Sequence, residues 1–316
     1  MKDRLEALKS FLEQENLDGY LVANEINIQY FTGFLGGARL LVPKEGACTL
    51  YVHMVNYEAA RESVRGIEIE PVGFGEDVNN KVADRFKQLK LRLVGFDSMD
   101  ASTYLKLKAA LKDVEIKPAK KVVWSLRKVK DEEEQRCIRR AAKLTSSGMH
   151  RAYEAIEPGL KERELAAEIE YAMRRNGSEG TAFDTIVVSG VRSAFPHGGC
   201  GDQEIAKGDL VVIDIGAKYQ GYCADLTRTV VINEASSKQA AIYQLVLSAQ
   251  DKAMRQIRAG VKARTVDAAA RNLIHEKGYG RYFVHGLGHG VGLEVHEPPV
   301  LNLKSEETLE AGNVVT

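Results

Sequence analysis

The chain has 316 residues, 44% of them hydrophobic, which is enough for two packed domains and unlike a disordered or fibrous protein. Its 44 basic and 44 acidic residues balance, so the strongly basic surface of a nucleic-acid-binding protein is not expected. The sequence shows no signal-peptide core and no long uncharged apolar run, which predicts a protein that is neither exported nor inserted in a membrane.

The first third of the chain alternates predicted helices and strands. Leu5, Leu8 and Leu12 recur at helical spacing, and a strand over Gly19 to Ala23 follows. Further strands are expected at 40–42 and 48–52 around a Pro- and Gly-containing turn, then a helix at 82–89, a strand at 93–96 and a helix at 101–111. We therefore predict a mixed α/β domain over residues 1–120.

A run of charged residues at 128–134 precedes a long helical pattern. Asp131 and Glu134 have the spacing of a capping box, and acidic residues are favoured at a helix start by the helix dipole. We interpret the run as a solvated helix start with no functional role. The second domain is expected over residues 128–316.

This second region contains an internal repeat. Gly159, Lys161, Arg163, Ala167 and Gly177 recur 101 positions later as Gly260, Lys262, Arg264, Ala268 and Gly278. Each copy predicts an amphipathic helix that stops at a glycine, followed by a strand at 183–188 or 282–285. Duplication of an α/β half explains the repeat, and chance similarity between two helices is the alternative. Two such halves facing each other would enclose a cleft.

Two strand-like runs each carry an aspartate, Asp214 in the first and Asp225 in the second. If Tyr219 and Gln220 form a two-residue turn between them, the register pairs the aspartates directly. The Cβ atoms of such neighbours are only about 4.5–5.5 Å apart, and like charges there destabilise unless something compensates them. A shared cation would do so, and the apolar residues around Asp214 favour this over a pair of solvated hairpin aspartates.

Five of the seven histidines lie between residues 195 and 297. Four of them, His197, His285, His289 and His296, stand in Gly- or Pro-rich segments, where the backbone can approach a ligand closely. We interpret the other three as ordinary core or surface residues. Imidazoles beside carboxylates suit manganese, cobalt, zinc or iron. The four cysteines lack paired spacing, which predicts reduced thiols in a cytoplasmic protein.

In this order, the segments Pro196-His197-Gly198, Asp214, Asp225, Gly288-His289-Gly290 and His296-Glu297-Pro298 resemble the pita-bread metallopeptidases, in particular prolidase and aminopeptidase P. Residues 30–34, Tyr-Phe-Thr-Gly-Phe, are similar to the signature of that family's amino-terminal domain. The resemblance implies an α/β (α+β) fold class. A mixed amino-terminal domain would precede a pita-bread catalytic domain, which is a duplicated α/β unit with a curved antiparallel sheet.

The resemblance also implies roles for individual residues. Asp214, Asp225 and His289 would bind two divalent ions, of manganese, cobalt or zinc, with Asp225 shared between them. His197, His285 and His296 would bind a short peptide substrate, and His197 and His296 would also stabilise the tetrahedral intermediate. The implied reaction is metal-assisted hydrolysis of short peptides, at Xaa-Pro bonds, by a homodimer.

The family's two remaining metal ligands are glutamates in the tail, the first within a Thr-x-Glu pattern. Thr316 matches the threonine of that pattern, and the sequence ends there. We therefore expect either a sequence cut short or a protein that has lost catalysis, and a chain ending at Thr316 should be a poor catalyst. A pita-bread scaffold that binds peptides or partners is the alternative function. A metal-free, creatinase-like hydrolase of a small amidine is disfavoured because Asp214, Asp225 and His289 are all retained.

Overall fold

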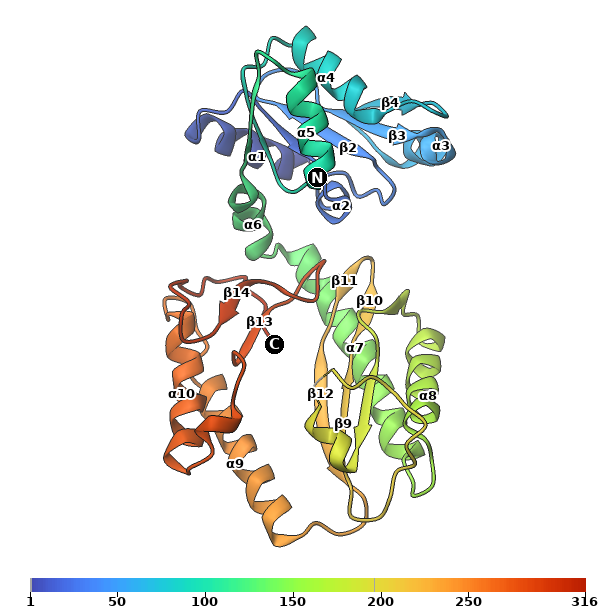
Figure 1. Ribbon diagram of the computed structural model, residues 1–316, viewed down its shortest axis with the longest axis vertical. Coiled ribbons are helices and arrows are strands. Elements are labelled where there is room, and N and C mark those ends of the chain that lie inside the picture. The colour runs from blue at the N-terminus through green and yellow to red at the C-terminus, as the bar shows by residue number, and fades with distance from the viewer. Residues whose placement is uncertain (1, 196) are drawn as a thin grey trace. The chain divides into compact units, whose positions relative to one another are not determined.

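The computed structural model describes residues 2–195 and 197–316, which divide into two compact units that meet between Arg127 and Lys128 (Figure 1). Pro196, which belongs to the Pro196-His197-Gly198 motif, lies outside the described residues. Each unit has its own sheets and its own buried core. Within the described residues, no helix combines the length and the apolar character that crossing a membrane requires.

The first unit is a mixed sheet with strand order β4-β3-β2-β1-β5-β6. The strands are β1 (Gly19–Val22), β2 (Arg39–Pro43), β3 (Thr49–His53), β4 (Glu68–Val72), β5 (Leu93–Phe96) and β6 (Glu115–Pro118). The helices are α1 (Lys2–Gln14), α2 (Glu25–Thr32), α3 (Met54–Ser63), α4 (Val78–Gln88), α5 (Ala101–Ala110) and α6 (Lys120–Lys128). Strands β2 and β3 pair antiparallel, which confirms the hairpin predicted around the Pro- and Gly-containing turn.

A buried polar network fixes helix α2 in this unit. The Asp97 carboxylate, just after β5, accepts hydrogen bonds from the Ala23 N–H at 2.8 Å and from Asn27 Nδ2 at 2.8 Å. Arg127 in turn donates to Asn27 Oδ1 at 2.7 Å. Residues 30–34, which resemble a family signature, form the buried end of α2 and its cap, where Gly33 has a φ of 71°. This signature therefore has a structural role here.

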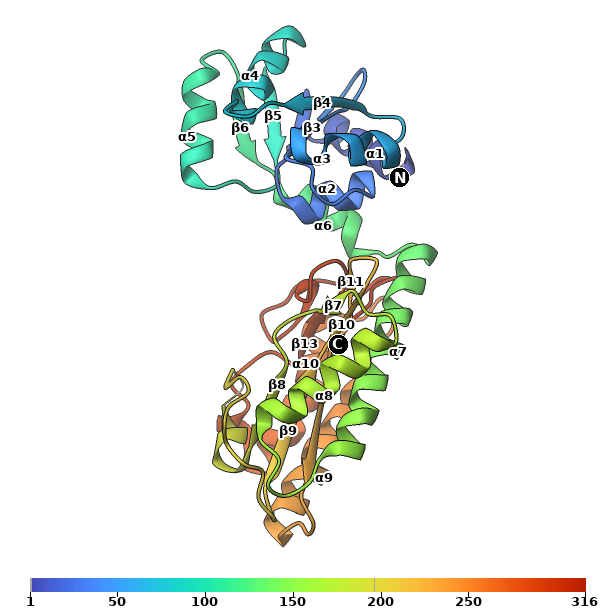
Figure 2. The same ribbon diagram turned by 90° about the vertical axis from the view of Figure 1, so that its right-hand side faces the viewer.

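The second unit contains helices α7 (Glu132–Ala155), α8 (Glu162–Arg175), α9 (Ser237–Met254) and α10 (Ala263–Glu276) and the short 3-10 helices η1 (Gly190–Ala194) and η2 (Gly280–Tyr282). Its strands are β7 (Gly180–Thr181), β8 (Ile186–Ser189), β9 (Leu210–Ile215), β10 (Ala217–Tyr219), β11 (Tyr222–Cys223), β12 (Leu226–Val231), β13 (Gly288–Gly290) and β14 (Glu297–Leu301). They form sheets of order β12-β9-β8, β11-β10-β7 and β13-β14. Helices α7 and α8 run along one side of the β8–β12 strands (Figures 1 and 2).

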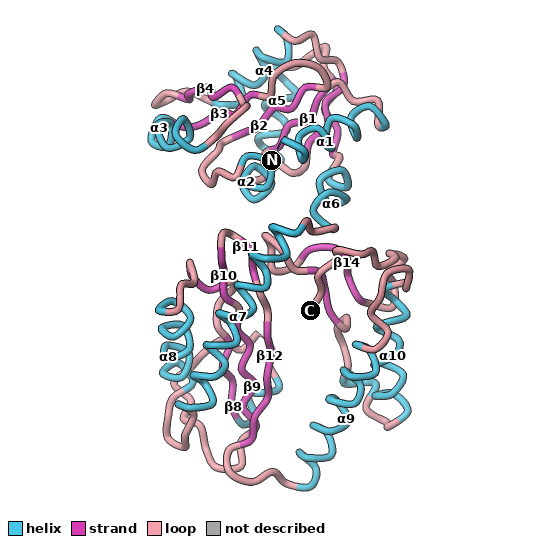
Figure 3. Tube along the Cα trace, turned by 180° about the vertical axis from the view of Figure 1, so that it is seen from behind, coloured by secondary structure: helices cyan, strands magenta, loops and turns pink. Residues whose placement is uncertain are grey.

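The predicted duplication is visible in the helices of this unit. Helices α8 and α10 each have 14 residues. Each is followed by a glycine in the left-handed region, Gly177 with a φ of 107° and Gly278 with a φ of 82°. Gly159 and Gly260 also play equivalent parts, because their N–H groups donate to Ile205 O and Leu309 O, both at 2.8 Å. Helices α9 and α10 lie on the side of β13 and β14, as α7 and α8 lie on the side of the other strands (Figure 3).

The prediction of a strand at 282–285, in the second copy of the repeat, is wrong. Residues Gly280–Tyr282 form η2, and the strand begins only at Gly288. The physical reason is that a side chain, and not a neighbouring strand, hydrogen-bonds to the backbone carbonyls of this segment. The Arg271 guanidinium donates to Phe283 O at 2.7 Å and to His285 O at 2.6 Å, so these carbonyls have partners without entering a sheet.

The charged run before α7 is only in part the solvated helix start that the sequence predicts, since Asp131, Glu132 and Glu133 are exposed. The capping box itself is confirmed, because the Glu134 N–H donates to Asp131 Oδ1 at 2.8 Å and the Asp131 N–H to Glu134 Oε2 at 2.9 Å. However, Lys130 and Glu134 are buried, each only 3% exposed. Lys130 Nζ lies 2.6 Å from Glu297 Oε1. The helix start is therefore tied to the residue that follows His296.

Candidate functional site

Asp214 and Asp225 come from neighbouring strands, but the predicted direct pairing between them is wrong. Asp214 on β9 stands opposite Thr227 on β12, and Thr227 Oγ1 donates to Asp214 Oδ1 at 2.7 Å. Asp225 directly precedes β12, so the two aspartates are diagonal neighbours. They still act on each other, because burial and then the Asp225 charge raise the pKa of Asp214, against the hydrogen bond from Thr227.

The register differs from the prediction because the turn lies one residue further along. Tyr219 pairs with Tyr222, so Gln220 and Gly221 form the two-residue loop. Their φ angles are 48° and 78°, which is the primed turn that suits the twist of a hairpin and that glycine adopts without strain. The Glu179 carboxylate accepts the N–H groups of both residues at 2.9 Å and holds this turn in place.

His289 lies on β13 and faces Asp225. Its Nε2 is 3.4 Å from Asp225 Oδ2, and its Nδ1 is 3.0 Å from the carbonyl of Gly290. A hydrogen bond to that carbonyl requires the proton on Nδ1, so Nε2 is the nitrogen that faces Asp225. Nε2 donates to Asp225 when the ring is protonated and presents a lone pair when it is neutral, as in a metal-binding imidazole. Burial lowers the pKa of His289, but the hydrogen bonds with Asp225 and Gly290 outweigh it, so that the pKa is raised.

His296 and His197 complete the cluster. The ring of His296 lies 4.1 Å from that of His289, centroid to centroid. Burial, and then the charge of His289, lower the pKa of His296. His197, in the loop after η1, is also near enough for its charge to lower the same pKa. The structure thus brings together Asp214, Asp225, His289 and His296, which lie far apart in the sequence, and His197 is linked to them by its charge interaction with His296.

His285, the sixth residue that the sequence singles out, is held elsewhere. It is exposed, its ring packs edge-on against Phe283 at 5.1 Å, and its Nδ1 is 2.6 Å from Gly286 O. Among the described residues, none of these contacts involves the cluster. His285 precedes β13 in the chain, on the same segment that leads into His289.

The glycines beside these histidines make room for the chain itself. A Cβ atom at Gly290 would collide with the Pro298 and Glu297 carbonyls, and one at Gly288 would collide with the carbonyl of Thr316. Gly198 would place a Cβ 2.9 Å from Val188 Cγ1. In the structure these glycines permit close packing, of β13 against β14 and the segment that ends at Thr316, and of Gly198 against Val188. That they also admit a ligand stays a prediction.

The donor atoms of this cluster fit divalent metal ions in type. Two carboxylates and an imidazole are ligands that manganese, cobalt and zinc accept. Among the described residues, no three His, Cys, Asp or Glu side chains gather into a compact ligand set. The donors instead stand in pairs, Asp225 with His289 by contact and Asp225 with Asp214 by charge.

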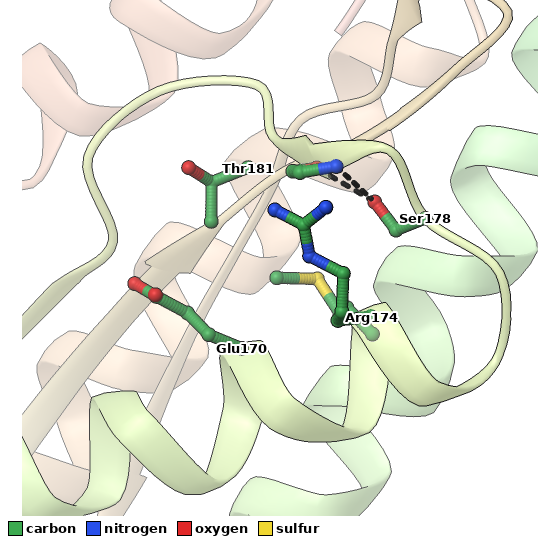
Figure 4. Close-up of a pocket in the computed structure, with 6 residues that line it drawn as sticks. Glu170, Arg174, Ser178 and Thr181 are labelled. Carbon is green, nitrogen blue, oxygen red and sulfur yellow. Dashed lines mark hydrogen bonds between the residues drawn. The ribbon is translucent and has the colours of Figure 1, made fainter.

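A small cavity of about 80 Å³ lies elsewhere in the second unit (Figure 4). It is lined by Glu170, Met173, Arg174, Ser178, Gly180 and Thr181. Its polar groups bind within the protein, since Arg174 donates to Glu179 O at 2.8 Å and Ser178 Oγ to Gly180 O at 2.6 Å. No histidine or aspartate lines it, so the clustered residues remain the candidate site.

Sequence reasoning missed three residues that support the cluster: Thr227, Lys130 and Glu297. Thr227 could have been found from the sequence, because a turn at Gln220-Gly221 puts it opposite Asp214. The Lys130–Glu297 pair could not, since nothing near either residue in the sequence names its partner.

The two-unit fold and the carboxylate–imidazole cluster together define a metal-dependent hydrolase. Residues 136–316 match the model of metallopeptidase family M24, and residues 4–129 match the creatinase/prolidase N-terminal domain. The chain belongs to metallopeptidase family M24 and is a metallopeptidase.

Similar proteins cover nearly the whole chain. The Xaa-Pro dipeptidase of Pyrococcus horikoshii is 41% identical over 100% of this chain and 89% of its own length. The structure of the Xaa-Pro dipeptidase from Bacillus anthracis superimposes with a TM-score of 0.94 at 37% identity, covering 99% of this chain and 88% of that one. The prolidase structure from Pyrococcus horikoshii gives a TM-score of 0.93 at 38% identity, over 99% and 89%. The pita-bread fold predicted for the second domain is confirmed.

Proposed function

We propose that this metallopeptidase hydrolyses Xaa-Pro dipeptides with the help of two divalent metal ions. The observation that carries the proposal is the contact of Asp225 with His289 across two strands, with Asp214 beside them. The similarity to relatives named Xaa-Pro dipeptidase supports proline after the scissile bond. The binding-module alternative has no comparable support.

In this proposal Asp214, Asp225 and His289 hold the ions, which are manganese, cobalt or zinc. When bound, such ions supply Lewis acidity at the scissile amide. The chain's own residues orient the ligands. Thr227 fixes one oxygen of Asp214, and the Gly290 carbonyl fixes the ring of His289 with Nε2 directed at the site.

His296 and His197 are proposed to act on the substrate. The ring of His296 lies beside that of His289, and His197 is near enough to His296 for their charges to interact. An imidazole N–H of either could donate to the oxygen of the scissile carbonyl as negative charge develops on it. His285 is proposed to bind a part of the peptide further from the bond that breaks.

We also propose a cytoplasmic homodimer. All four cysteines are free thiols, which suits a reducing compartment such as the cytoplasm. Sedimentation equilibrium would test the dimer.

The substrate is tested by comparing Ala-Pro with Ala-Ala on the purified full-length protein supplied in turn with manganese, cobalt and zinc. We expect release of free proline from Ala-Pro at a higher kcat/KM than release of alanine from Ala-Ala. Adding Ala-Pro-Ala separates a dipeptidase from an aminopeptidase, because only the latter accepts it. Faster cleavage of Ala-Ala with all three metals would contradict the proline preference.

Replacing His296 or His197 with alanine is expected to lower kcat about 100-fold or more, because each removes a donor to the developing oxyanion. Metal content should stay at the wild-type level, since neither residue is proposed as a ligand. Elemental analysis and steady-state kinetics measure the two quantities. His150→Ala, at an exposed position on α7, is the matched control and should change neither. Loss of metal from His296→Ala would make His296 a ligand instead.

A further inference from the structure

Two fully buried carboxylates lie outside the proposed site, one in each half of the second unit. Glu162 is the first residue of α8, and Asp267 lies on α10, and both side chains are 0% exposed. A buried carboxylate is costly unless hydrogen bonds and a cation satisfy it. The groups that donate to these two carboxylates either lie in the segments that carry the histidines or are themselves hydrogen-bonded to those segments.

Glu162 anchors the loop that carries His197. One carboxylate oxygen accepts the Ser189 N–H at 2.7 Å and the Ser189 hydroxyl at 3.0 Å, and the other accepts the Gly201 N–H at 3.0 Å. Arg192 Nε donates to both oxygens, at 3.2 and 3.1 Å. Arg192 then extends the anchor to the histidine, because its terminal nitrogen donates to Gly198 O at 2.9 Å. Both ends of the loop and the residue after His197 are thus tied to one buried charge.

Asp267 does the same for the segment that carries His285 and leads into His289. Its oxygens accept Arg271 Nε at 2.7 Å and the other guanidinium nitrogen at 2.9 Å. The Leu287 N–H also donates to Asp267, at 2.9 Å. The remaining donors of Arg271 go to the carbonyls of Phe283 and His285, at 2.7 and 2.6 Å. The guanidinium also stacks over the Phe283 ring, 4.1 Å from its centroid.

The two anchors share chemistry but are not copies of each other in the repeat. At the repeat offset of 101, Glu162 corresponds to Ala263 and Asp267 to Ala166. The arginine lies on the 3-10 helix η1 in the first half and on α10 in the second. Each half has therefore reached a buried carboxylate–arginine clamp by its own route. The two clamps are therefore not a copied feature of the repeat, and what they have in common is that each binds a segment that carries a histidine.

These segments need an anchor because the described residues of each form little regular structure, η1 in the first and the start of β13 in the second. Both are also rich in glycine, which loses more backbone freedom on ordering than other residues. Hydrogen bonds between ionised groups, or from backbone N–H to a carboxylate, are roughly twice as strong as neutral ones. Out of contact with bulk water, such bonds hold a loop more firmly still.

We propose that Glu162–Arg192 and Asp267–Arg271 are positioning pairs, the first for His197 and the second for the segment from His285 to His289. The proposal rests on the proposed function. The pairs act through the histidines and do not touch substrate or metal. The first pair should affect turnover without affecting metal binding, and the second should affect metal binding, because His289 is a proposed ligand.

Arg192→Gln tests the first pair in a double-mutant cycle with His197→Ala. In the wild-type background we expect kcat/KM for Ala-Pro to fall about 10-fold or more, since small displacements of a reacting group cost up to ~100-fold. In the His197→Ala background the same change should cost less than about 2-fold, because the residue that it positions is gone. Arg192→Lys, which keeps the charge, should recover part of the loss. Arg139→Gln, at an exposed arginine of α7 whose side chain contacts Gln135 on the same helix, is the control and should change neither background.

Arg271→Gln tests the second pair without measuring activity. Calorimetric titration with Mn²⁺ should show metal affinity lowered by ~10–100-fold, the loss typical when a residue that orients a ligand is removed. Arg192→Gln should leave that affinity unchanged. Hydrogen exchange of the metal-free proteins should be faster over 189–201 in Arg192→Gln and over 283–289 in Arg271→Gln, each variant affecting its own segment alone.

Equal losses of kcat/KM in the two His197 backgrounds would overturn the positioning role of Arg192. Unchanged Mn²⁺ affinity, or exchange that rises throughout the second unit in both variants, would overturn the role of Arg271 and reduce the pairs to general stabilisation. These outcomes are separate from the proposed function. The wild-type protein on Ala-Pro tests the substrate, whereas the Mn²⁺ titration and the exchange pattern test the clamps even if another dipeptide is the substrate.

Discussion

Replacing Asp225 with asparagine is expected to remove most of the bound metal and nearly all activity. Asparagine has almost the same shape but no charge, so the variant isolates the electrostatic role of the side chain. Asp225 contacts His289 and acts on Asp214, which makes it the ligand that both proposed ion positions share. The loss of affinity should exceed the ~10–100-fold typical of changing a residue that merely orients a ligand.

Elemental analysis and calorimetric titration of the purified variant measure this loss. Asp251→Asn, at an exposed position on α9, makes the same chemical change away from the site and should keep full metal content. Asp214→Asn should also lose metal, since removing either carboxylate leaves the other without its shared cation. Wild-type metal content in Asp225→Asn would rule out the ligand assignment.

Replacing Lys130 with methionine is expected to lower the free energy of unfolding by about 3–5 kcal/mol. The side chains of Lys130 and Glu297 are each 1% exposed, and their charged atoms lie 2.6 Å apart. Removing the ammonium takes away a cation that lies 2.6 Å from a carboxylate that stays buried, which costs far more than the loss of a surface pair. Urea unfolding followed by circular dichroism measures the change.

Lys128 offers a matched control two residues away. It pairs with Glu310 at 2.5 Å, but the two side chains are 19% and 52% exposed, so Lys128→Met should cost less than about 1 kcal/mol. Combining Lys130→Met with Glu297→Gln should recover much of the loss, because neither charge is then buried alone. If Lys130→Met destabilises no more than Lys128→Met, the buried pair does not hold the helix start against the segment of His296.

Several elements could be predicted from the sequence because their causes are local. The capping box of Asp131 and Glu134 spans four residues, and the helices of the repeat are defined by apolar spacing and a final glycine. The candidate site residues can also be recognised from the sequence, because short local patterns mark them. Asp214, Asp225, His289 and His296 each interrupt or border a characteristic short pattern, and their order along the chain carried the resemblance to the family.

Only the tertiary structure decided the strand register, the buried charges and the loops. The register depends on which two residues of the turn adopt a positive φ. These are Gln220 and Gly221, and Glu179, from another part of the chain, stabilises them in that conformation. Lys130 and Glu297 look like surface residues until a fold places them together. The predicted strand at 282–285 is a loop because Arg271 satisfies its carbonyls. Hydrogen bonds and ion pairs between residues distant in the sequence leave no local pattern. The sequence by itself therefore determined most of the helices and strands and the residue types of the candidate site. The tertiary structure determined how those residues are held.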